Sequence, residues 1–244
     1  MEVTSMCTAL SYQAGSHYFG RTLDLTASCG ETVTITPRDY PFSFRKAGEL
    51  TRHYALIGAA LVTEQYPLYF EATNERGLSM AGLNFPGNAD YGPEAPGRDN
   101  LSPFELIPWV LGQCASLAEV RPLLERLNLT DTPFSPELPL APLHWIISDR
   151  ESSLTVESVR EGLRIYDNPA GVLTNNPPFD FQMQHLSQFL NLTREIPVNR
   201  FSPRVRLEPH SLGMGALGLP GDLSSSSRFV RAAFAALNSV SGET

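Results

Sequence analysis

Alternating apolar and polar residues dominate the first 85 positions of the chain and predict a series of β-strands. Residues 7–12 alternate in this way, and Thr32–Thr36 does so with β-branched side chains, which favour a pleated strand. Apolar runs predict further strands over 54–62, 68–72 and 78–83, the last two separated by a Gly-containing turn. The segment 85–102, interrupted repeatedly by glycine and proline, is predicted to be a loop.

Two consecutive helices are predicted in the middle of the chain. Each begins with a capping pattern, Ser-Pro-Phe-Glu at 102–105 and Ser-Leu-Ala-Glu at 116–119. The first helix is expected to continue to Cys114 with a kink at Pro108, and the second to cover 120–127.

The remaining chain mixes strands and helices. Four prolines make residues 131–142 an extended loop. Apolar patterns then predict strands over 143–148, 153–158, 163–166 and 172–174, and helices over 179–189 and 224–237. The order of strands, two helices, strands and helices favours a single α+β layered domain, because no segment has the composition of an interdomain linker.

Composition narrows the class of protein. The chain has 244 residues, of which 42% are hydrophobic and 18% charged, as is typical of a globular domain and not of a disordered chain. A net charge of −8 argues against a surface for nucleic acid or anionic membranes, and the apolar runs are too short to span a bilayer. The first fifteen residues lack the pattern of a secretory signal, so we expect a cytoplasmic location.

The cysteines and histidines are sparse and scattered. The three cysteines, Cys7, Cys29 and Cys114, do not form the pattern of a disulfide framework. Neither a CxxC motif nor a Cys/His cluster occurs, which argues against a structural zinc site. We therefore expect no metal and no cofactor.

Cys7 is the first candidate for chemistry because it follows a second methionine, Met6. Initiation at Met6, or removal of residues 1–6, would leave Cys7 with a thiol and a free α-amine on one residue. Such an amine has a reference pKa of roughly 7.7–8.0 and can act as general base for the thiol. Position alone also fits a small buried side chain on an edge strand.

Five further polar residues lie at the ends of predicted elements. Arg21 and Asp24 follow a strand that can form a hairpin with the first strand, where the arginine would favour a thiolate and the carboxylate could hold an amine. Asn84 and Asn175 end buried strands, where amides can form an oxyanion hole, and Arg228 lies in the first turn of a helix. Each also fits a structural role as a surface pair, a turn cap or a solvated helix position. No histidine accompanies them, which argues against a papain-like Cys–His pair.

Six short motifs follow one another along the chain: Met-Cys-Thr at 6–8, Phe-Gly-Arg-Thr-Leu-Asp at 19–24, Ala-Gly-Leu-Asn-Phe-Pro at 81–86, Leu-His-Trp-Ile-Ile-Ser-Asp at 143–149, Gly-Val-Leu-Thr-Asn at 171–175, and Gly-Leu-Pro-Gly-Asp at 218–222 continuing to Ser-Arg-Phe at 227–229. In this order they resemble the choloylglycine hydrolase family, the N-terminal nucleophile amide hydrolases that include bile salt hydrolases and penicillin V acylases. The resemblance extends from residue 7 to about residue 237. It implies a four-layer αββα sandwich, in which two antiparallel sheets lie between helix layers.

The resemblance also implies the catalytic residues. The family's nucleophile matches Cys7, the arginine beside its thiol matches Arg21, and the carboxylate that holds its α-amine matches Asp24. The two oxyanion asparagines match Asn84 and Asn175, and a second, supporting arginine matches Arg228. The thiol attacks an amide carbonyl while the α-amine of the same cysteine takes and returns the proton. Water then hydrolyses the acyl-enzyme, and no metal or cofactor takes part.

The expected substrate follows from the same resemblance. Bile salt hydrolases usually have asparagine at the position of Asn84, where penicillin acylases often have tyrosine, so we expect glycine- or taurine-conjugated bile acids. Leu23 and Phe134 are expected to line an apolar pocket for the sterol. Neither nucleic acid nor membrane insertion is expected, and the family implies a bacterial homo-oligomer, a tetramer.

The resemblance also concerns the chain boundaries. We expect residues 1–6 to be a leader that is removed or not translated, which leaves 7–244 as one N-terminal nucleophile hydrolase domain. Family chains continue for several dozen residues beyond the helix of Arg228, so the C-terminal strands of the sandwich are expected to be missing here. Two alternatives remain open: a penicillin V acylase-type amidase, and an inactive truncated relative that binds acyl amides without turnover. A non-enzymatic α+β scaffold would require six coincidental motifs.

Overall fold

The computed structural model describes residues 6–240 and 242. In chain order its elements are β1 (Met6–Ala14), β2 (Ser16–Asp24), β3 (Thr32–Thr36), β4 (Phe42–Phe44), β5 (Gly48–Leu50), β6 (Leu56–Thr63), β7 (Tyr66–Asn74), β8 (Ser79–Asn84), β9 (Asp99–Leu101), α1 (Leu106–Gln113), α2 (Leu117–Glu125), β10 (Leu127–Leu129), β11 (Leu143–Ser148), β12 (Ser153–Val159), β13 (Gly162–Asp167), β14 (Val172–Leu173), α3 (Phe179–Leu186) and α4 (Ser225–Asn238). Short 3₁₀ turns lie at Pro103–Glu105, Ser187–Phe189 and Met214–Ala216.

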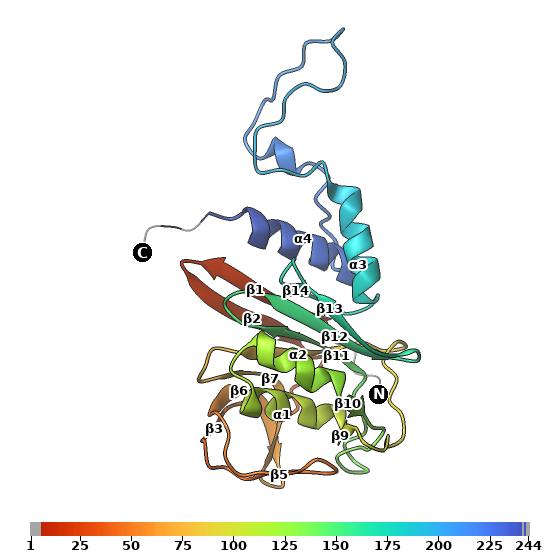
Figure 1. Cartoon of the computed structure of the whole chain (residues 1–244). Helices are drawn as coiled ribbons and strands as arrows, with labels where there is room; N and C mark the ends of the chain where they lie inside the picture. Colours follow the sequence, from red (N-terminus) through yellow and green to blue (C-terminus); the bar gives the residue numbers. More distant parts are fainter. Residues whose placement is uncertain (1–5, 241, 243–244) are drawn as a thin grey trace.

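Four layers stack in the order helices, sheet, sheet, helices (Figure 1), and the predicted αββα sandwich is confirmed. Helices α3 and α4 form one outer layer, and α4 packs on the three-stranded sheet β14-β1-β2. Helices α1 and α2 form the other outer layer, on the seven-stranded antiparallel sheet β13-β12-β11-β8-β7-β6-β3. The two sheets face each other, with β1 against β8 and β14 against β11.

The central strands of the larger sheet, β8 and β11, are buried on both faces, which explains their continuous apolar sequences. Successive side chains of a strand point to opposite faces. Met80 and Ile147 therefore belong to the core beneath the α1–α2 layer, while Ala81 and Ile146 belong to the core shared with the smaller sheet. A polar residue in the middle of these strands, such as His144, is consequently buried.

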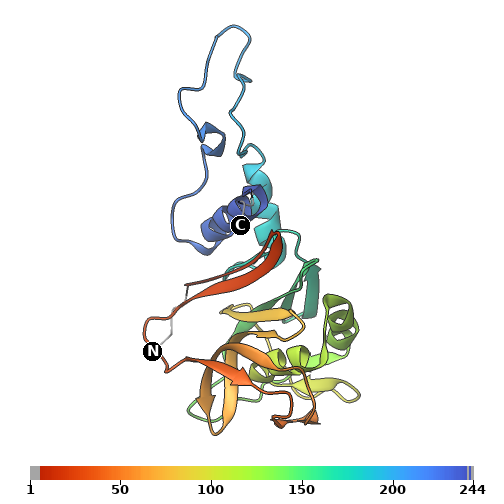
Figure 2. The same cartoon turned by 90° about the vertical axis from the view of Figure 1, so that its left-hand side faces the viewer.

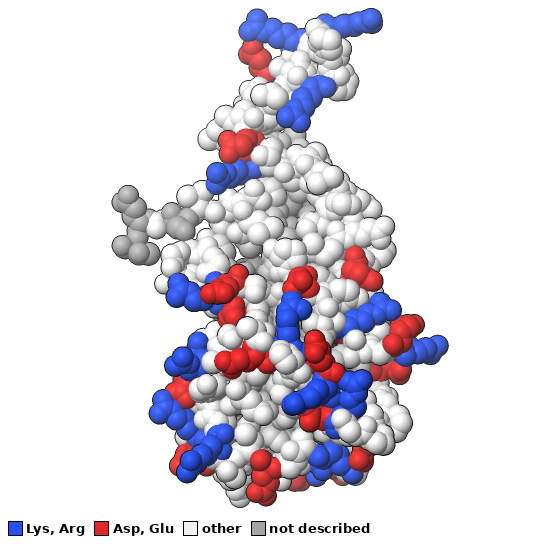
Figure 3. Space-filling model, in the orientation of Figure 1, with Lys and Arg blue, Asp and Glu red and all other residues white. Residues whose placement is uncertain are grey.

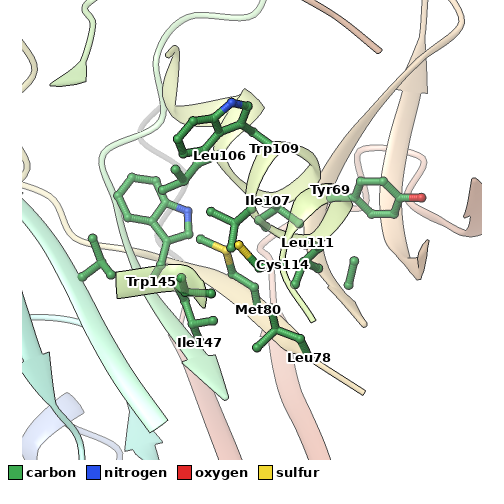
Figure 4. Packing of buried hydrophobic residues seen from close by; sticks show 14 of the residues in the cluster. Tyr69, Leu78, Met80, Leu106, Ile107, Trp109, Leu111, Cys114, Trp145 and Ile147 are labelled. Atoms are coloured by element: carbon green, nitrogen blue, oxygen red, sulfur yellow. The ribbon is translucent and has the colours of Figure 1, made fainter. Parts of the chain in front are cut away.

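The larger core lies between the seven-stranded sheet and the α1–α2 layer (Figure 4). Trp145 of β11 is fully buried there against Met80, and Leu106 and Leu111 approach from α1. Burying side chains of this size stabilises the fold by about 1.5–3 kcal/mol each. This core fixes the position of β8 and β11, and with them the sheet that faces β1.

Two predicted helices have wrong boundaries. The first helix opens with a 3₁₀ turn, and α1 begins only at Leu106. Pro108 therefore lies in the first turn of α1, where the N–H that proline lacks would have no partner within the helix. The reason to expect a kink at Pro108 is thus removed. The second helix begins at Leu117 and ends at Glu125.

Short strands account for most of the other differences. Residues 127–129 form β10, which begins at the predicted last residue of the second helix and pairs in parallel with β9 inside the predicted loop 85–102. The ribbon β4–β5 carries no predicted strand at all. Each of these strands has three residues, too few to show a period, and each is stabilised by its partner.

Residues 190–224, between α3 and α4, extend away from the layers as a long irregular segment (Figures 1 and 2). Large apolar side chains are exposed along it, among them Leu190, Phe201 and Leu212. Charged side chains of both signs are interspersed over the lower layers, whereas the α3–α4 face is mostly uncharged (Figure 3). No described helix has the length and apolar character needed to cross a membrane. The homo-oligomeric state of the protein stays a prediction.

Asn74, the last residue of β7, joins the β7–β8 turn to the end of α1. Its side chain is buried; Nδ2 donates to the carbonyl oxygens of Leu111 and Cys114, both at 2.8 Å. Its Oδ1 accepts from the backbone nitrogens of Arg76 and Leu78 at 3.0 and 3.1 Å. One amide thus satisfies four backbone groups that have few other partners.

We expect Asn74→Ala to lower the free energy of unfolding by about 2–4 kcal/mol, because it leaves buried backbone groups without partners. Urea denaturation followed by circular dichroism measures the change. Asn238→Ala is the matched control, since the Asn238 amide donates only to Phe234 near the end of α4, and should change stability by less than about 0.5 kcal/mol. Equal effects of the two substitutions would contradict the role of Asn74.

Candidate active site

Cys7 is the second residue of β1, and its side chain lies in the core between the two sheets, 1% exposed. β1 turns into β2 at Gly15, whose φ of +73° favours glycine, and the hairpin register sets Cys7 opposite Leu23. Cys7 belongs to a buried cluster of apolar residues that includes Ala81 and Val172. Any charge near it is therefore weakly screened by solvent.

Arg21, on β2, supplies such a charge. Its guanidinium is 3% exposed; Nη2 donates to Sγ of Cys7 at 2.9 Å and Nη1 to Oε2 of Glu71 at 3.0 Å. A guanidinium remains protonated at any physiological pH, so the sulfur of Cys7 has a permanent positive charge beside it. The structure thus places Arg21 between the sulfur of Cys7 and the carboxylate of Glu71.

Glu71 received no role from the sequence, although it completes this arrangement. It lies on β7 of the larger sheet, beside the irregularity in the β6–β7 pairing at Ala59 and Ala60. Burial raises the pKa of the Glu71 carboxyl, and the charge of Arg21 opposes that rise. Glu71 is the one acidic residue of β7, and a lone carboxylate within a buried strand is the signal that could have revealed it.

Asn175, which follows β14, contacts several elements with one side chain. Its Oδ1 accepts from the backbone nitrogen of Cys7 at 2.9 Å and from Nη2 of Arg228 at 2.8 Å. Its Nδ2 donates to the carbonyl oxygen of Asn84 at 2.8 Å, and its backbone nitrogen donates to Oγ of Ser225 at 2.9 Å. An amide nitrogen carries two hydrogens, so one donor of Asn175 remains beyond the bond to Asn84.

Arg228 lies in the first turns of α4, which begins after the N-cap Ser224. Its Nη1 donates to the carbonyl oxygen of Cys7 and to Oγ1 of Thr8, the latter at 2.8 Å. Partial burial lowers the pKa of Arg228, while Cys7 and Asp24 act in the opposite direction. Asp24 is exposed at the end of β2, and the hairpin register pairs it with Met6, the residue that precedes Cys7.

The two residues predicted to line a substrate pocket lie in different surroundings. Leu23 is directly across the hairpin from Cys7 and packs against the same apolar group. Phe134 packs with Tyr66 and Phe104, at centroid distances of 6.0 and 5.3 Å, and borders a cavity of about 370 Å³. The described residues around that cavity do not include Leu23, so the structure does not bring the two together.

The three cysteines differ in electrostatic surroundings. Burial raises the pKa of Cys114 to about 12, and partial burial with Glu31 raises that of Cys29. Cys7, in contrast, has a guanidinium on its sulfur. The described residues hold no group of three or more His, Cys, Asp or Glu side chains able to bind a metal ion. The chemical groups around Cys7 are its own thiol, two guanidiniums, an amide and a carboxylate.

A cysteine at the start of a strand in the smaller sheet of an αββα sandwich is the arrangement of the N-terminal nucleophile hydrolases. The family model described as linear amide C-N hydrolases, choloylglycine hydrolase family, matches residues 7–244. The bile salt hydrolase/transferase of Lactiplantibacillus plantarum is 55% identical over 239 residues, which cover 98% of this chain and 74% of the relative.

Solved structures agree with this similarity. A crystal structure of a mutant conjugated bile acid hydrolase from Clostridium perfringens has a TM-score of 0.85 and 36% identity, covering 94% of this chain and 71% of that one. A penicillin V acylase from Agrobacterium tumefaciens has a TM-score of 0.70 at 22% identity, covering 95% of this chain and 65% of that one, and shares the fold. The chain belongs to the choloylglycine hydrolase family and is a hydrolase of linear amide C–N bonds.

We expect Arg21→Gln to lower the rate of Cys7 alkylation by iodoacetamide at least about tenfold at neutral pH, because the loss of the guanidinium charge disfavours the reactive thiolate. The rate is measured by mass spectrometry in a Cys29→Ser background. Arg38→Gln removes an exposed arginine that pairs with Glu75, far from Cys7 in the hydrogen-bond network, and should leave the rate unchanged. An equal rate in Arg21→Gln and the parent would contradict the contact's influence on the sulfur.

Proposed function

We propose that this protein hydrolyses the amide bond of glycine- or taurine-conjugated bile acids, with Cys7 as an N-terminal nucleophile. The observation that carries the proposal is the pair of contacts on one residue, Arg21 on the sulfur and Asn175 on the backbone nitrogen. The 55% identity to a bile salt hydrolase/transferase supports the class of substrate.

The α-nitrogen of Cys7 must be a free amine for this chemistry. While Met6 precedes Cys7, that nitrogen belongs to a peptide bond and has no basic lone pair. Initiation at Met6 with its removal, or cleavage before Cys7, would free an amine that can still donate to Oδ1 of Asn175 at the observed position. Asp24, at the end of the paired strand, is then available to hold the extra positive charge.

The first half of the reaction forms an acyl-enzyme. The α-amine of Cys7 takes the thiol proton, and the thiolate attacks the carbonyl carbon of the amide to form a C–S bond. The remaining Nδ2 hydrogen of Asn175, with the amide of Asn84, stabilises the oxyanion. The α-ammonium then returns its proton to the departing nitrogen, so glycine or taurine leaves as an amine and a thioester remains.

The second half regenerates the enzyme. The α-amine of Cys7 takes a proton from water, the hydroxide attacks the thioester carbonyl, and the C–S bond breaks to release the bile acid and restore the thiol. Arg21 stabilises the sulfur whenever it is anionic, and Arg228 holds the carbonyl oxygen of Cys7 and Oδ1 of Asn175 in place. We expect Leu23, across the hairpin from Cys7, to contact the sterol, and Phe134 to contribute from its separate aromatic group.

Glycocholate and taurocholate should release glycine and taurine in the presence of this protein. We expect Cys7→Ala to abolish release, and Cys7→Ser to retain less than about 1% of kcat because a hydroxyl is a far weaker nucleophile. Cys114→Ala, a buried cysteine of the other core, is the matched control and should keep kcat within about twofold. Release of the amino acid is measured with ninhydrin.

Two outcomes would replace the proposal. Cleavage of penicillin V with no release from either bile salt would favour the acylase-type amidase, whose structural relative shares the fold at 22% identity. Binding of glycocholate without turnover, by protein whose first residue is Cys7, would favour an inactive relative.

Intact mass spectrometry of the active protein should give the mass of a chain that begins at Cys7, because only a free α-amine can serve as the base. The proportion of chains that begin at Cys7 should rise together with the specific activity across preparations. Full activity in a preparation whose chains all retain Met6 would contradict the mechanism.

A further inference from the structure

A buried histidine–glutamate pair lies beside the segment that carries Asn175 and has no part in the reaction described above. His144 of β11 and Glu157 of β12 are directly opposite each other in the sheet. Both side chains are 0% exposed, and Nδ1 of His144 lies 3.0 Å from Oε1 of Glu157. Ionisable side chains are rarely buried so completely in a sheet unless they hold other groups in place.

The pair contacts both ends of the 174–179 segment. Nε2 of His144 lies 2.8 Å from the carbonyl oxygen of Thr174, and since a carbonyl oxygen only accepts, Nε2 carries the hydrogen. Oε1 of Glu157 accepts from the backbone nitrogen of Phe179, the first residue of α3, at 3.0 Å. Asn175 lies between these two contacts, directly after the first.

The imidazole is held in a single orientation. The ring of Phe85 stacks on it with a centroid distance of 4.2 Å and an interplanar angle of 7°. Phe85 directly follows Asn84, whose carbonyl oxygen accepts from Nδ2 of Asn175. The imidazole of His144 therefore contacts both segments that meet at the Asn175 amide. Hydrogen bonds at both of its nitrogens prevent it from rotating.

We infer that His144 and Glu157 are positioning residues for amide hydrolysis, which hold the 174–179 segment so that Asn175 meets the nitrogen of Cys7; the inference rests on the proposed function for the reaction itself. The pair acts through the backbone of Thr174 and Phe179 and not on the substrate. A shift of this segment would move Oδ1 of Asn175 away from Cys7 and its Nδ2 away from the developing oxyanion. Displacement of a catalytic group by ~1 Å can cost about 10²-fold in rate.

Three variants separate positioning from stability. Glu157→Gln keeps an oxygen that can accept from the nitrogen of Phe179, and it removes the buried charge. Adding His144→Leu to Glu157→Gln removes the donor to Thr174 without leaving an unpaired carboxylate. Adding His144→Gln to Glu157→Gln restores an amide donor at that position. Asn74→Ala, on the other side of the larger sheet, controls for a loss of stability alone.

Steady-state hydrolysis of glycocholate gives the first test. We expect Asn74→Ala to keep kcat within about threefold of the parent. Relative to Glu157→Gln alone, the variant with His144→Leu should lose about 10–100-fold in kcat with KM changed less than about threefold, and the variant with His144→Gln should recover part of that loss. Equal kcat values for Glu157→Gln with and without His144→Leu would overturn the inference.

Hydrogen–deuterium exchange gives a second test that does not depend on turnover. Peptides that cover 172–180 should exchange at least about tenfold faster with His144→Leu present than in Glu157→Gln alone, while peptides from β6 and β7 stay unchanged. Unchanged exchange over 172–180 would overturn the inference even in an active enzyme. If the parent cleaves no amide, the proposed function fails, and the exchange result still decides whether the pair holds the segment.

Discussion

A buried guanidinium is the constraint on which the site depends. Arg21 is 3% exposed and permanently charged, and a buried charge that loses its partner costs about 3–5 kcal/mol. Its two partners come from different sheets, the Glu71 carboxylate from β7 and the Cys7 sulfur from β1. The packing of the two sheets therefore brings the guanidinium, the carboxylate and the sulfur together.

Asn175 has a comparable place in the backbone of the site. It lies 168 residues after Cys7 in sequence, and its side chain and backbone nitrogen join β1, the end of β8 and α4. On the other side of the same segment, His144 contacts the backbone just before it. The Asn175 amide is thus held by hydrogen bonds to three different elements.

Local sequence patterns predicted the fold where an element is long enough to show a period. Thr32–Thr36 and Leu143–Ser148 have the predicted bounds, and α4 differs from its prediction by one residue at each end. The strands of three residues, such as β9 and β10, were missed because their stability comes from each other and not from their own pattern. The end of α2 was misplaced for the same reason, since β10 takes the residues that would have continued the helix.

The sequence by itself determined the family, the hydrolase class and the candidate residues of the site, because short motifs around Cys7, Arg21 and Asn175 occur in a specific order. Only the tertiary structure decided that Glu71 pairs with Arg21, that Phe134 lies in an aromatic group apart from Leu23, and that a buried pair supports the Asn175 segment. These contacts join residues that are dozens of positions apart. Side-chain contacts of this range depend on how sheets and helices pack, and they leave no periodic trace in a local stretch of sequence.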